Sequence, residues 1–256
     1  MKQEKRLKDI MDFLKIQGSY SIKELSALFK IPSPTLYRDI LKLEKEGLVR
    51  KYYGNIELDE SRKPDTNYYN RLKINTIQKK SIAIEAAKLV ENGDTIALDD
   101  STTSYFLAQE LNAKDINLQI ITNSAIIPFE FLNNKKIQII NPGGFLNFEI
   151  LCYAAPLLDL KKINLHTKYF FFSMLGADPE KGILEIYLPE VIDMKNYLRN
   201  ISDKVICLSD SSKFDKKGTI NWIKWNEIYK IITDDSISED KLNSYLEKGI
   251  EIIVAK

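Results

Sequence analysis

The chain has 256 residues, of which 44% are hydrophobic and 29% are charged, and its formal net charge is +1. This length suggests two domains, and the composition is that of a folded, water-soluble protein. No internal repeat or low-complexity tract stands out, and no apolar run reaches the roughly 18 residues of a membrane span. Cys152 and Cys207 lie far apart, so we expect reduced, buried thiols. The N-terminus lacks an apolar signal core, so the expected compartment is the cytoplasm.

The charge is unevenly distributed along the chain. Residues 1–55 hold twelve Lys and Arg against seven Asp and Glu, whereas residues 56–256 are mildly acidic. A basic segment attached to an acidic body is typical of a nucleic-acid binder with a second function. The bias is small, so it indicates DNA only together with a matching local fold.

Residues 1–58 read as three short helices followed by a hairpin. The first helix repeats apolar residues from Leu7 to Leu14 and stops at Gly18. Ser21 and Glu24 form a capping box that opens the second helix. Ser33 is expected to cap the third helix, with Pro34 at its first position. Gly54-Asn55 is then a tight turn between two short strands.

This order of elements predicts a winged helix-turn-helix domain that binds double-stranded DNA. The third helix would enter the major groove and the basic hairpin would lie on backbone phosphate. A plain helical bundle with a solvated polar face is the alternative. The expected contacts are, on the helix, Ser33, Thr35, Tyr37, Arg38 and Lys42, and, on the wing, Arg50 and Lys51.

Residues 59–75 have no apolar periodicity and are expected to form a linker. From 76 to 256, helical stretches alternate with short apolar strands at residues 96–98, 118–121, 137–140, 169–174, 205–208 and 250–254. Strands this apolar are buried on both faces. The fold class is therefore α/β, with the small DNA-binding domain followed by a larger α/β domain built on a mostly parallel sheet.

Polar residues gather where these strands end, which is where ligands bind in such sheets. Hydroxyls and amides at a helix start suit an anion, Lys213 would supply the cation for a phosphate, and Asp99 and Asp210 could accept sugar hydroxyls. Ordinary helix capping is the alternative for each loop alone. The candidate residues are Asp99, Ser101, Thr102, Thr103, Thr122, Asn123, Ser124, Gly143, Gly144, Gly176, Asp178, Asp210 and Lys213.

Cofactor and metal motifs are missing from the sequence. There is no dinucleotide-binding or phosphate-loop glycine pattern, and one histidine, His166, cannot build a zinc cluster. We therefore expect no cofactor.

The motifs resemble those of the DeoR family of bacterial regulators over nearly the full chain. Residues 35–40, TLYRDI, are similar to the family's T-[IV]-R-R-D-L helix motif, with Tyr37 in place of an arginine. Residues 99–103, DDSTT, are similar to its D-x-G-T-T loop, with Ser101 in place of glycine. Lys195 matches a family lysine whose usual glutamate partner is displaced to Glu190. Further matches are residues 122–124, 143–144, 176–178 and 210–214.

The resemblance implies a sensor domain related to phosphosugar isomerases, a phosphorylated sugar as effector, Lys195 at its site, and a homo-oligomer, dimer or tetramer. The leading hypothesis is a repressor of a sugar-catabolism operon that a sugar phosphate releases from DNA. Two alternatives stay open. One is a sugar-phosphate isomerase or transferase with Asp99 as base. The other is a regulator whose sensor has lost its ligand.

Overall fold

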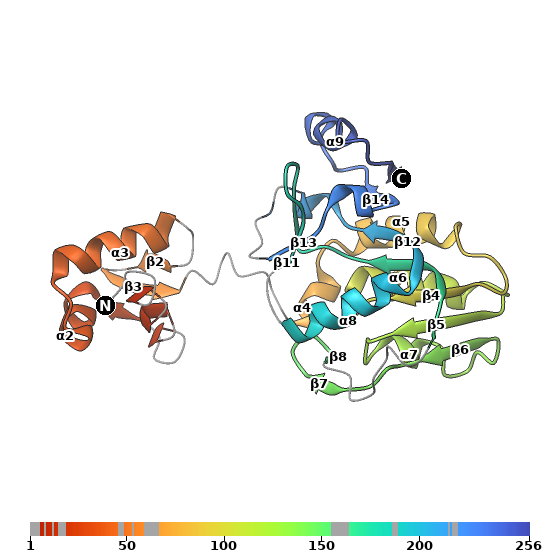
Figure 1. The fold of residues 1–256 in the computed structure, drawn as a ribbon, viewed down its shortest axis with the longest axis horizontal. Coiled ribbons are helices and arrows are strands. Elements are labelled where there is room, and N and C mark those ends of the chain that lie inside the picture. The colour runs from red at the N-terminus through yellow and green to blue at the C-terminus, as the bar shows by residue number, and fades with distance from the viewer. Residues whose placement is uncertain are drawn as a thin grey trace. The chain divides into compact units, whose positions relative to one another are not determined.

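The structure is a computed structural model of the chain. It describes residues 6–7, 9–11, 13–14, 19–45, 49–52, 54–58, 67–154, 164–185, 189–214, 216 and 220–256. The chain divides into two compact units, a head of residues 1–64 and a body of residues 65–256 (Figure 1).

The head combines helices with a small antiparallel sheet. Residues 6–7, 9–11 and 13–14 are helical, and α2 (Ile22–Phe29) and α3 (Ser33–Lys45) follow. The sheet has the order β1-β3-β2, with β1 at Tyr20–Ser21, β2 at Val49–Tyr52 and β3 at Asn55–Leu58. Ser21 and Glu24 form the expected capping box. The apolar faces meet in one core of Leu7, Ile10, Leu14, Leu25, Ile31, Leu36, Ile40, Leu43, Val49 and Ile56.

Two local expectations for the head were wrong. The Leu36 amide donates to the Pro32 carbonyl at 3.0 Å, so Ser33 lies inside the first turn of α3 and does not cap it. Asn55 pairs with Tyr52 and belongs to β3, while Gly54 takes the turn at a φ of +82° that favours glycine.

The body is built on a seven-stranded sheet whose strand pairs are all parallel, as expected. Its order is β15-β14-β12-β9-β4-β5-β6. The strands are β4 (Thr95–Leu98), β5 (Leu118–Thr122), β6 (Ile137–Ile140), β9 (Thr167–Phe172), β12 (Ser202–Leu208), β14 (Lys230–Asp234) and β15 (Ile252–Ala255).

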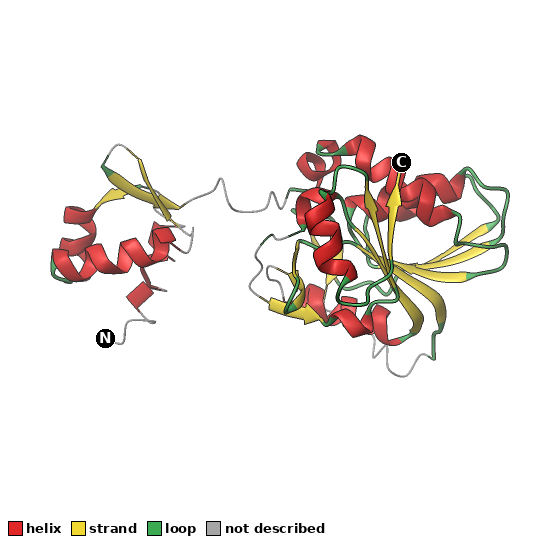
Figure 2. Cartoon of the chain, turned by 90° about the horizontal axis from the view of Figure 1, so that it is seen from above, coloured by secondary structure: helices red, strands yellow, loops and turns green. Residues whose placement is uncertain are grey.

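Both faces of this sheet are covered, which explains why its strands are so apolar (Figure 2). Phe171 packs in the cluster with α5 (Thr76–Ala87), α6 (Thr102–Asn112) and α7 (Ile127–Glu130). Its neighbours Phe170 and Phe172 point to the other face, as alternation along a strand requires. That face holds α8 (Pro189–Asn200), α9 (Glu239–Leu246) and an antiparallel sheet of β10 (Gly176–Asp178), β11 (Gly182–Glu185) and β13 (Ile220–Ile223).

The second half of the expected linker is part of the body. Residues 59–66 lie outside the described residues, but Tyr68–Lys73 forms helix α4. Tyr68 is buried, and its amide donates to the Glu149 carbonyl at 2.9 Å. Glu149 lies between β7 (Phe145–Asn147) and β8 (Cys152–Ala154), which form a separate hairpin.

Both cysteines are free and buried, as the sequence predicts. Within the described part of the chain, no helix has the length and apolar character needed to cross a bilayer.

Candidate functional site

The polar loops that follow β12, β9, β4 and β5 all begin at the carboxyl ends of their strands, on the same side of the sheet. These four strands are neighbours and run parallel, so their carboxyl ends lie side by side. The sheet therefore brings together loops that are more than a hundred residues apart in the sequence. This end of the strands is the usual ligand position in a parallel sheet.

Asp99 is the centre of this cluster and is fully buried. Its Oδ1 accepts from the Ser101 amide at 3.0 Å and from the Ser104 hydroxyl at 2.6 Å, and its Oδ2 accepts from the Ser173 amide at 3.0 Å. Lys195 of α8 places Nζ 3.4 Å from the same Oδ2. Asp99 thus ties β4 to α6, to the loop after β9 and to α8.

Lys195 is buried beside Asp99, and its ammonium also lies 5.2 Å from the centre of the Trp222 ring. The family resemblance pairs this lysine with a glutamate that is displaced here to Glu190, whose side chain lies outside the described residues. In this structure Lys195 forms an ion pair with the carboxylate of Asp99.

The N-terminus of α6 forms one wall of the cluster. Ser101 is its N-cap and accepts from the Ser104 amide at 3.1 Å. Thr102 and Thr103, both buried, form the first turn. Amides of a first helical turn point outward without intrahelical acceptors and favour an anion. The departure from glycine at Ser101 therefore has a structural role, which is to cap this helix.

The end of β5 contributes one side chain with unused capacity. The hydroxyls of Thr122 and Ser124 accept from nearby backbone amides and shape the turn into α7. Asn123 is fully buried, and its Nδ2 donates to Asp100 at 3.2 Å. Its Oδ1 has no hydrogen-bond partner among the described residues.

The end of β12 is arranged around Asp210. Its carboxylate caps the short helix η3 (Ser211–Lys213) and accepts from the Asn75 amide group at 2.8 Å. Lys79 of α5 is buried nearby. Burial lowers the pKa of Lys79 to about 8, an effect that Asp210 opposes and that Lys213 and Arg71 reinforce. The charges of Lys213 and Arg71 therefore act on Lys79 in this part of the site.

Four predicted residues have a less direct relation to this cluster. Gly143 and Gly144 follow the edge strand β6 at φ values of +70° and +127°. A Cβ on Gly176 would lie 2.3 Å from the Lys216 carbonyl oxygen, so this glycine permits close packing. Asp178 accepts the amides of Glu180 and Lys181 in the turn between β10 and β11. The structure thus shows packing and turn roles for Gly176 and Asp178, and their contact with an effector stays a prediction.

Sequence reasoning missed the contribution of residues 67–75. These residues bring Tyr68, Arg71 and Asn75 to the body, from a segment that had been assigned to a linker. The signal available was modest: Asn67 caps α4, and Tyr68 and Leu72 have the spacing of an inward face.

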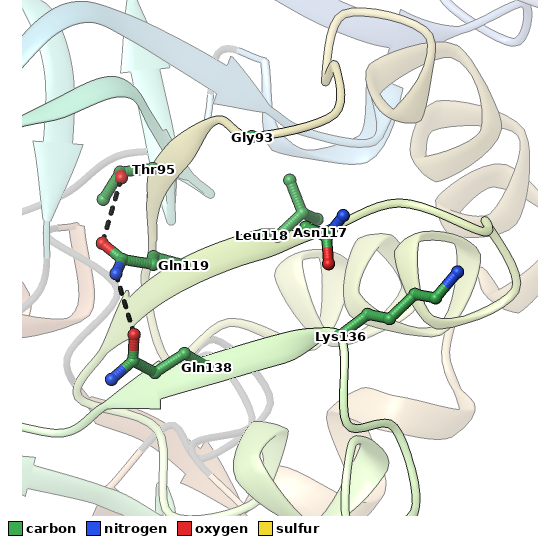
Figure 3. A pocket seen from close by; sticks show the side chains of 7 residues that line it. All are labelled: Gly93, Thr95, Asn117, Leu118, Gln119, Lys136 and Gln138. Atoms are coloured by element: carbon green, nitrogen blue, oxygen red, sulfur yellow. Dashed lines mark hydrogen bonds between the residues drawn. The ribbon is translucent and has the colours of Figure 1, made fainter.

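An open hollow of about 400 Å³ lies at the opposite, amino end of the sheet (Figure 3). It is lined by Gly93, Thr95, Asn117, Leu118, Gln119, Lys136 and Gln138. Thr95, Gln119 and Gln138 join across three strands by hydrogen bonds of 3.3 and 2.8 Å. Lys136 and Asn117 bond Asp115 and Asn92, which lie outside the lining, and none of the predicted effector residues lines the hollow.

The outer face of α3 carries the residues predicted to contact DNA, and most of them are exposed to solvent. Tyr37 is 46% exposed, Ser33, Arg38 and Lys42 are exposed, and Thr35 is half-buried. Ser33 donates its hydroxyl to Ser26 of α2 at 3.1 Å. The side chain of Arg50 lies outside the described residues.

Lys51 connects the wing to α3. Its ammonium lies 2.9 Å from a Glu44 carboxylate oxygen and 4.9 Å from the centre of the Tyr37 ring. The hydrogen bond to Glu44 raises the pKa of Lys51. The wing lysine that was expected on phosphate is therefore engaged by the recognition helix in this structure.

A bidentate ion pair fixes α3 in the head. Arg6 donates from Nε to Asp39 Oδ2 at 2.5 Å and from Nη2 to Asp39 Oδ1 at 3.1 Å. Asp39 is buried on the inner side of α3, so this pair links the first helical segment to the recognition helix.

Comparisons with known proteins agree with both units. Residues 6–62 match the family model of the DeoR-like helix-turn-helix domain, and residues 74–235 match the DeoR C terminal sensor domain. The L-fucose operon activator of Escherichia coli K12 is 31% identical, over 90% of this chain and 94% of that protein. The lactose phosphotransferase system repressor of Lactococcus lactis is also 31% identical, over 96% of each chain.

Among solved structures, ribose 5-phosphate isomerase A of Methanocaldococcus jannaschii is similar with a TM-score of 0.42 and 18% identity, over 56% of each chain. The family models together span most of the described sequence, and the curated relatives named above are regulators of transcription. This chain belongs to the DeoR family of transcriptional regulators.

Proposed function

We propose that this protein represses a sugar-catabolism operon. We further propose that a phosphorylated sugar, bound at the carboxyl ends of the strands in the body's sheet, controls its affinity for DNA. The observation that carries the proposal is the union, in one chain, of an exposed cationic helix face and a buried polar cluster rich in cations. A regulator of this kind acts where the DNA is, which favours the cytoplasm. Ligand and DNA would each favour a different state of a homo-oligomer.

The DNA half of the proposal rests on α3. Arg38 and Lys42 stand outward on a helix whose inner face is fully packed, so their heads are available for base edges and phosphate. Fragments that the protein retains from a random duplex library supply the operator. Arg38→Ala should then lower affinity for the best fragment by about 1–3 kcal/mol. Lys23→Ala, which removes an exposed cation from α2, is the matched control.

The effector half rests on the loop after β12. Lys213 lies close enough to Lys79 to lower its pKa, and an anion there would relieve the repulsion between the two ammonium groups. Calorimetry with hexose and pentose monophosphates, each beside its unphosphorylated sugar, should show preference for the phosphorylated form. Lys213→Ala should weaken that binding about ten- to a hundred-fold, and Lys216→Ala, an exposed neighbour, should not.

A sensor is favoured over an isomerase by the state of Asp99, the one candidate base. Its carboxylate already accepts three hydrogen bonds and contacts Lys195, which leaves little capacity to take a proton from a substrate carbon. Sugar phosphates should remain unchanged over hours with purified protein while one of them alters its DNA affinity. Sustained conversion that Asp99→Asn abolishes would contradict this assignment.

A further inference from the structure

The guanidinium group of Arg71, in α4, has two buried nitrogen atoms that form no hydrogen bond within the described part of the chain. Its Nε and Nη2 are both shielded from solvent and have no hydrogen-bond partner among the described residues. A buried donor without an acceptor is costly, and a charged one more so. Such groups are rare in folded proteins, and a bound ion, water or ligand is one way in which they are satisfied.

The head shows how this chain satisfies the same two nitrogen atoms of an arginine when it supplies its own acceptor. Arg6 uses Nε and Nη2 to hold both oxygens of Asp39, at 2.5 and 3.1 Å. Two parallel N–H groups of a guanidinium match the spacing of two oxygens on a carboxylate or a phosphate. The corresponding edge of Arg71 thus has the geometry to hold an oxyanion in a bidentate manner.

The groups around Arg71 match a ligand that also carries hydroxyls. The Tyr68 ring centre lies 5.8 Å from the guanidinium carbon, and the Tyr68 hydroxyl is likewise buried without a partner among the described residues. So is Oδ1 of the fully buried Asn123. Burial raises the pKa of the Tyr68 phenol, with Arg71, Asp100 and Asp99 among the charges that act on it, so these side chains share one region. Together they offer donors for an anion and an acceptor for a hydroxyl.

Further contacts connect α4 with the cluster at the strand ends. Burial raises the pKa of the Cys152 thiol, and Asp100, Lys195 and Arg71 all contribute to its electrostatic surroundings. The backbone of Cys152 forms an isolated antiparallel β-bridge with Ser124, the residue next to Asn123. The Tyr68 amide ties α4 to the hairpin of β7 and β8, which lies beside it (Figure 1). The unsatisfied groups therefore adjoin the proposed effector site.

We propose that Arg71 binds the phosphate of the effector through Nε and Nη2, and that effector binding thereby fixes α4, the first helix of the body after the head. This inference rests on the proposed function, because it adds a residue and a route of regulation to the same site. It places one phosphate contact directly in the chain that leads to the DNA-binding domain. A bound effector would alter the start of that segment without requiring a change deep in the sheet.

The test uses the full chain, inorganic phosphate, and a panel of hexose and pentose monophosphates in calorimetry. Arg71→Gln removes the charge and Arg71→Lys keeps the charge but loses the fork. Lys73→Gln, an exposed cation on the same helix, is the control. Both Arg71 variants should bind the best sugar phosphate about ten- to a hundred-fold more weakly than wild type, with Lys73→Gln unchanged. The thermal midpoint of the ligand-free variants should be no lower than that of wild type, because an unpaired buried charge has been removed or left unchanged.

Three results overturn the inference in different ways. Wild-type affinity in both Arg71 variants would show that Arg71 does not touch the ligand, while the proposed function stands. A lowered midpoint without ligand, with affinity retained, would assign Arg71 to the fold alone. Failure of wild type to bind any phosphorylated compound would remove the proposed effector class, and this inference with it.

Discussion

Lys79 offers a quantitative test of the electrostatics in the body. Its side chain is 4% exposed, and Nζ donates to the Arg71 carbonyl, with no carboxylate in ion-pair contact among the described residues. Burial lowers its pKa from 10.5 to about 8. Each pH unit between the folded and unfolded values corresponds to about 1.4 kcal/mol, so keeping this ammonium charged costs about 3 kcal/mol at neutral pH.

Lys79→Met removes the charge and retains a long unbranched side chain. The Arg71 carbonyl still accepts from the Ile74 amide at 3.3 Å, so the lost hydrogen bond subtracts only about 1 kcal/mol from the gain. We expect the ligand-free variant to be more stable than wild type by about 1–2 kcal/mol at pH 7. Urea unfolding followed by tryptophan fluorescence measures this directly, because both tryptophans, Trp222 and Trp225, lie in the body.

The pH dependence supplies the control. Between pH 8 and 10 the unfolded chain keeps a proton that folded wild type releases, so this group makes wild-type stability rise with pH. The variant lacks that contribution, and its advantage should shrink over the same range. A variant less stable than wild type at pH 7, or an advantage that does not change with pH, would refute the reasoning.

Three further predictions concern the effector site and two ion pairs of the head. Effector affinity should fall as pH rises above about 8. A phosphate bound by Lys213 and Arg71, whose charges both act on Lys79, would also favour the protonated form of Lys79. Calorimetry near pH 8 in buffers of different ionisation enthalpy should show proton uptake, and its absence would contradict the placement of the phosphate. Glu44→Gln should release Lys51 and steepen the dependence of DNA affinity on salt by about one unit, whereas an unchanged slope would mean that Lys51 never reaches the phosphate. Asp39→Ala should remove the two hydrogen bonds that Arg6 donates to Asp39 and accelerate hydrogen exchange in head peptides by at least about tenfold, and unaltered exchange would show that the pair does not stabilise the head.

Elements with strong local signals could be predicted from the sequence. The capping box of Ser21 and Glu24 needs only one turn of helix to form, and the apolar strand at Ile137–Ile140 was placed with the bounds it has in the structure. The parallel sheet followed from strands apolar on both faces. Strand β14, residues 230–234, was missed, although its residues are all buried, because the run is short and begins with Lys230.

The candidate site was predicted in outline because the carboxyl ends of parallel strands must share an edge. What could not be predicted is which polar groups the protein itself satisfies. The backbone amides of Glu180 and Lys181, for example, both donate to Oδ1 of Asp178, a local turn that the residue's position after β9 does not reveal. Lys195 and Asp99 were each expected at the site, but their mutual contact depends on how α8 packs across the sheet. Arg71 lies in α4, a helix of only six residues, and its position near the site depends on how α4 packs on the body.

The way residues 67–75 are bound has a practical consequence for dividing the molecule. The side-chain amide of Asn75 donates to Asp210 and Ser212 at 2.8 and 3.2 Å, and the backbone amide of Tyr68 donates to the Glu149 carbonyl. One short segment therefore contacts two loops from distant parts of the sequence. A truncated sensor fragment that begins at residue 76 would lose both sets of contacts and expose to solvent the residues that Tyr68 packs against. Such a fragment would fail in a ligand screen even if the intact regulator responds. The cut that preserves the sensor lies before residue 67, closer to the DNA-binding domain than the sequence pattern indicates.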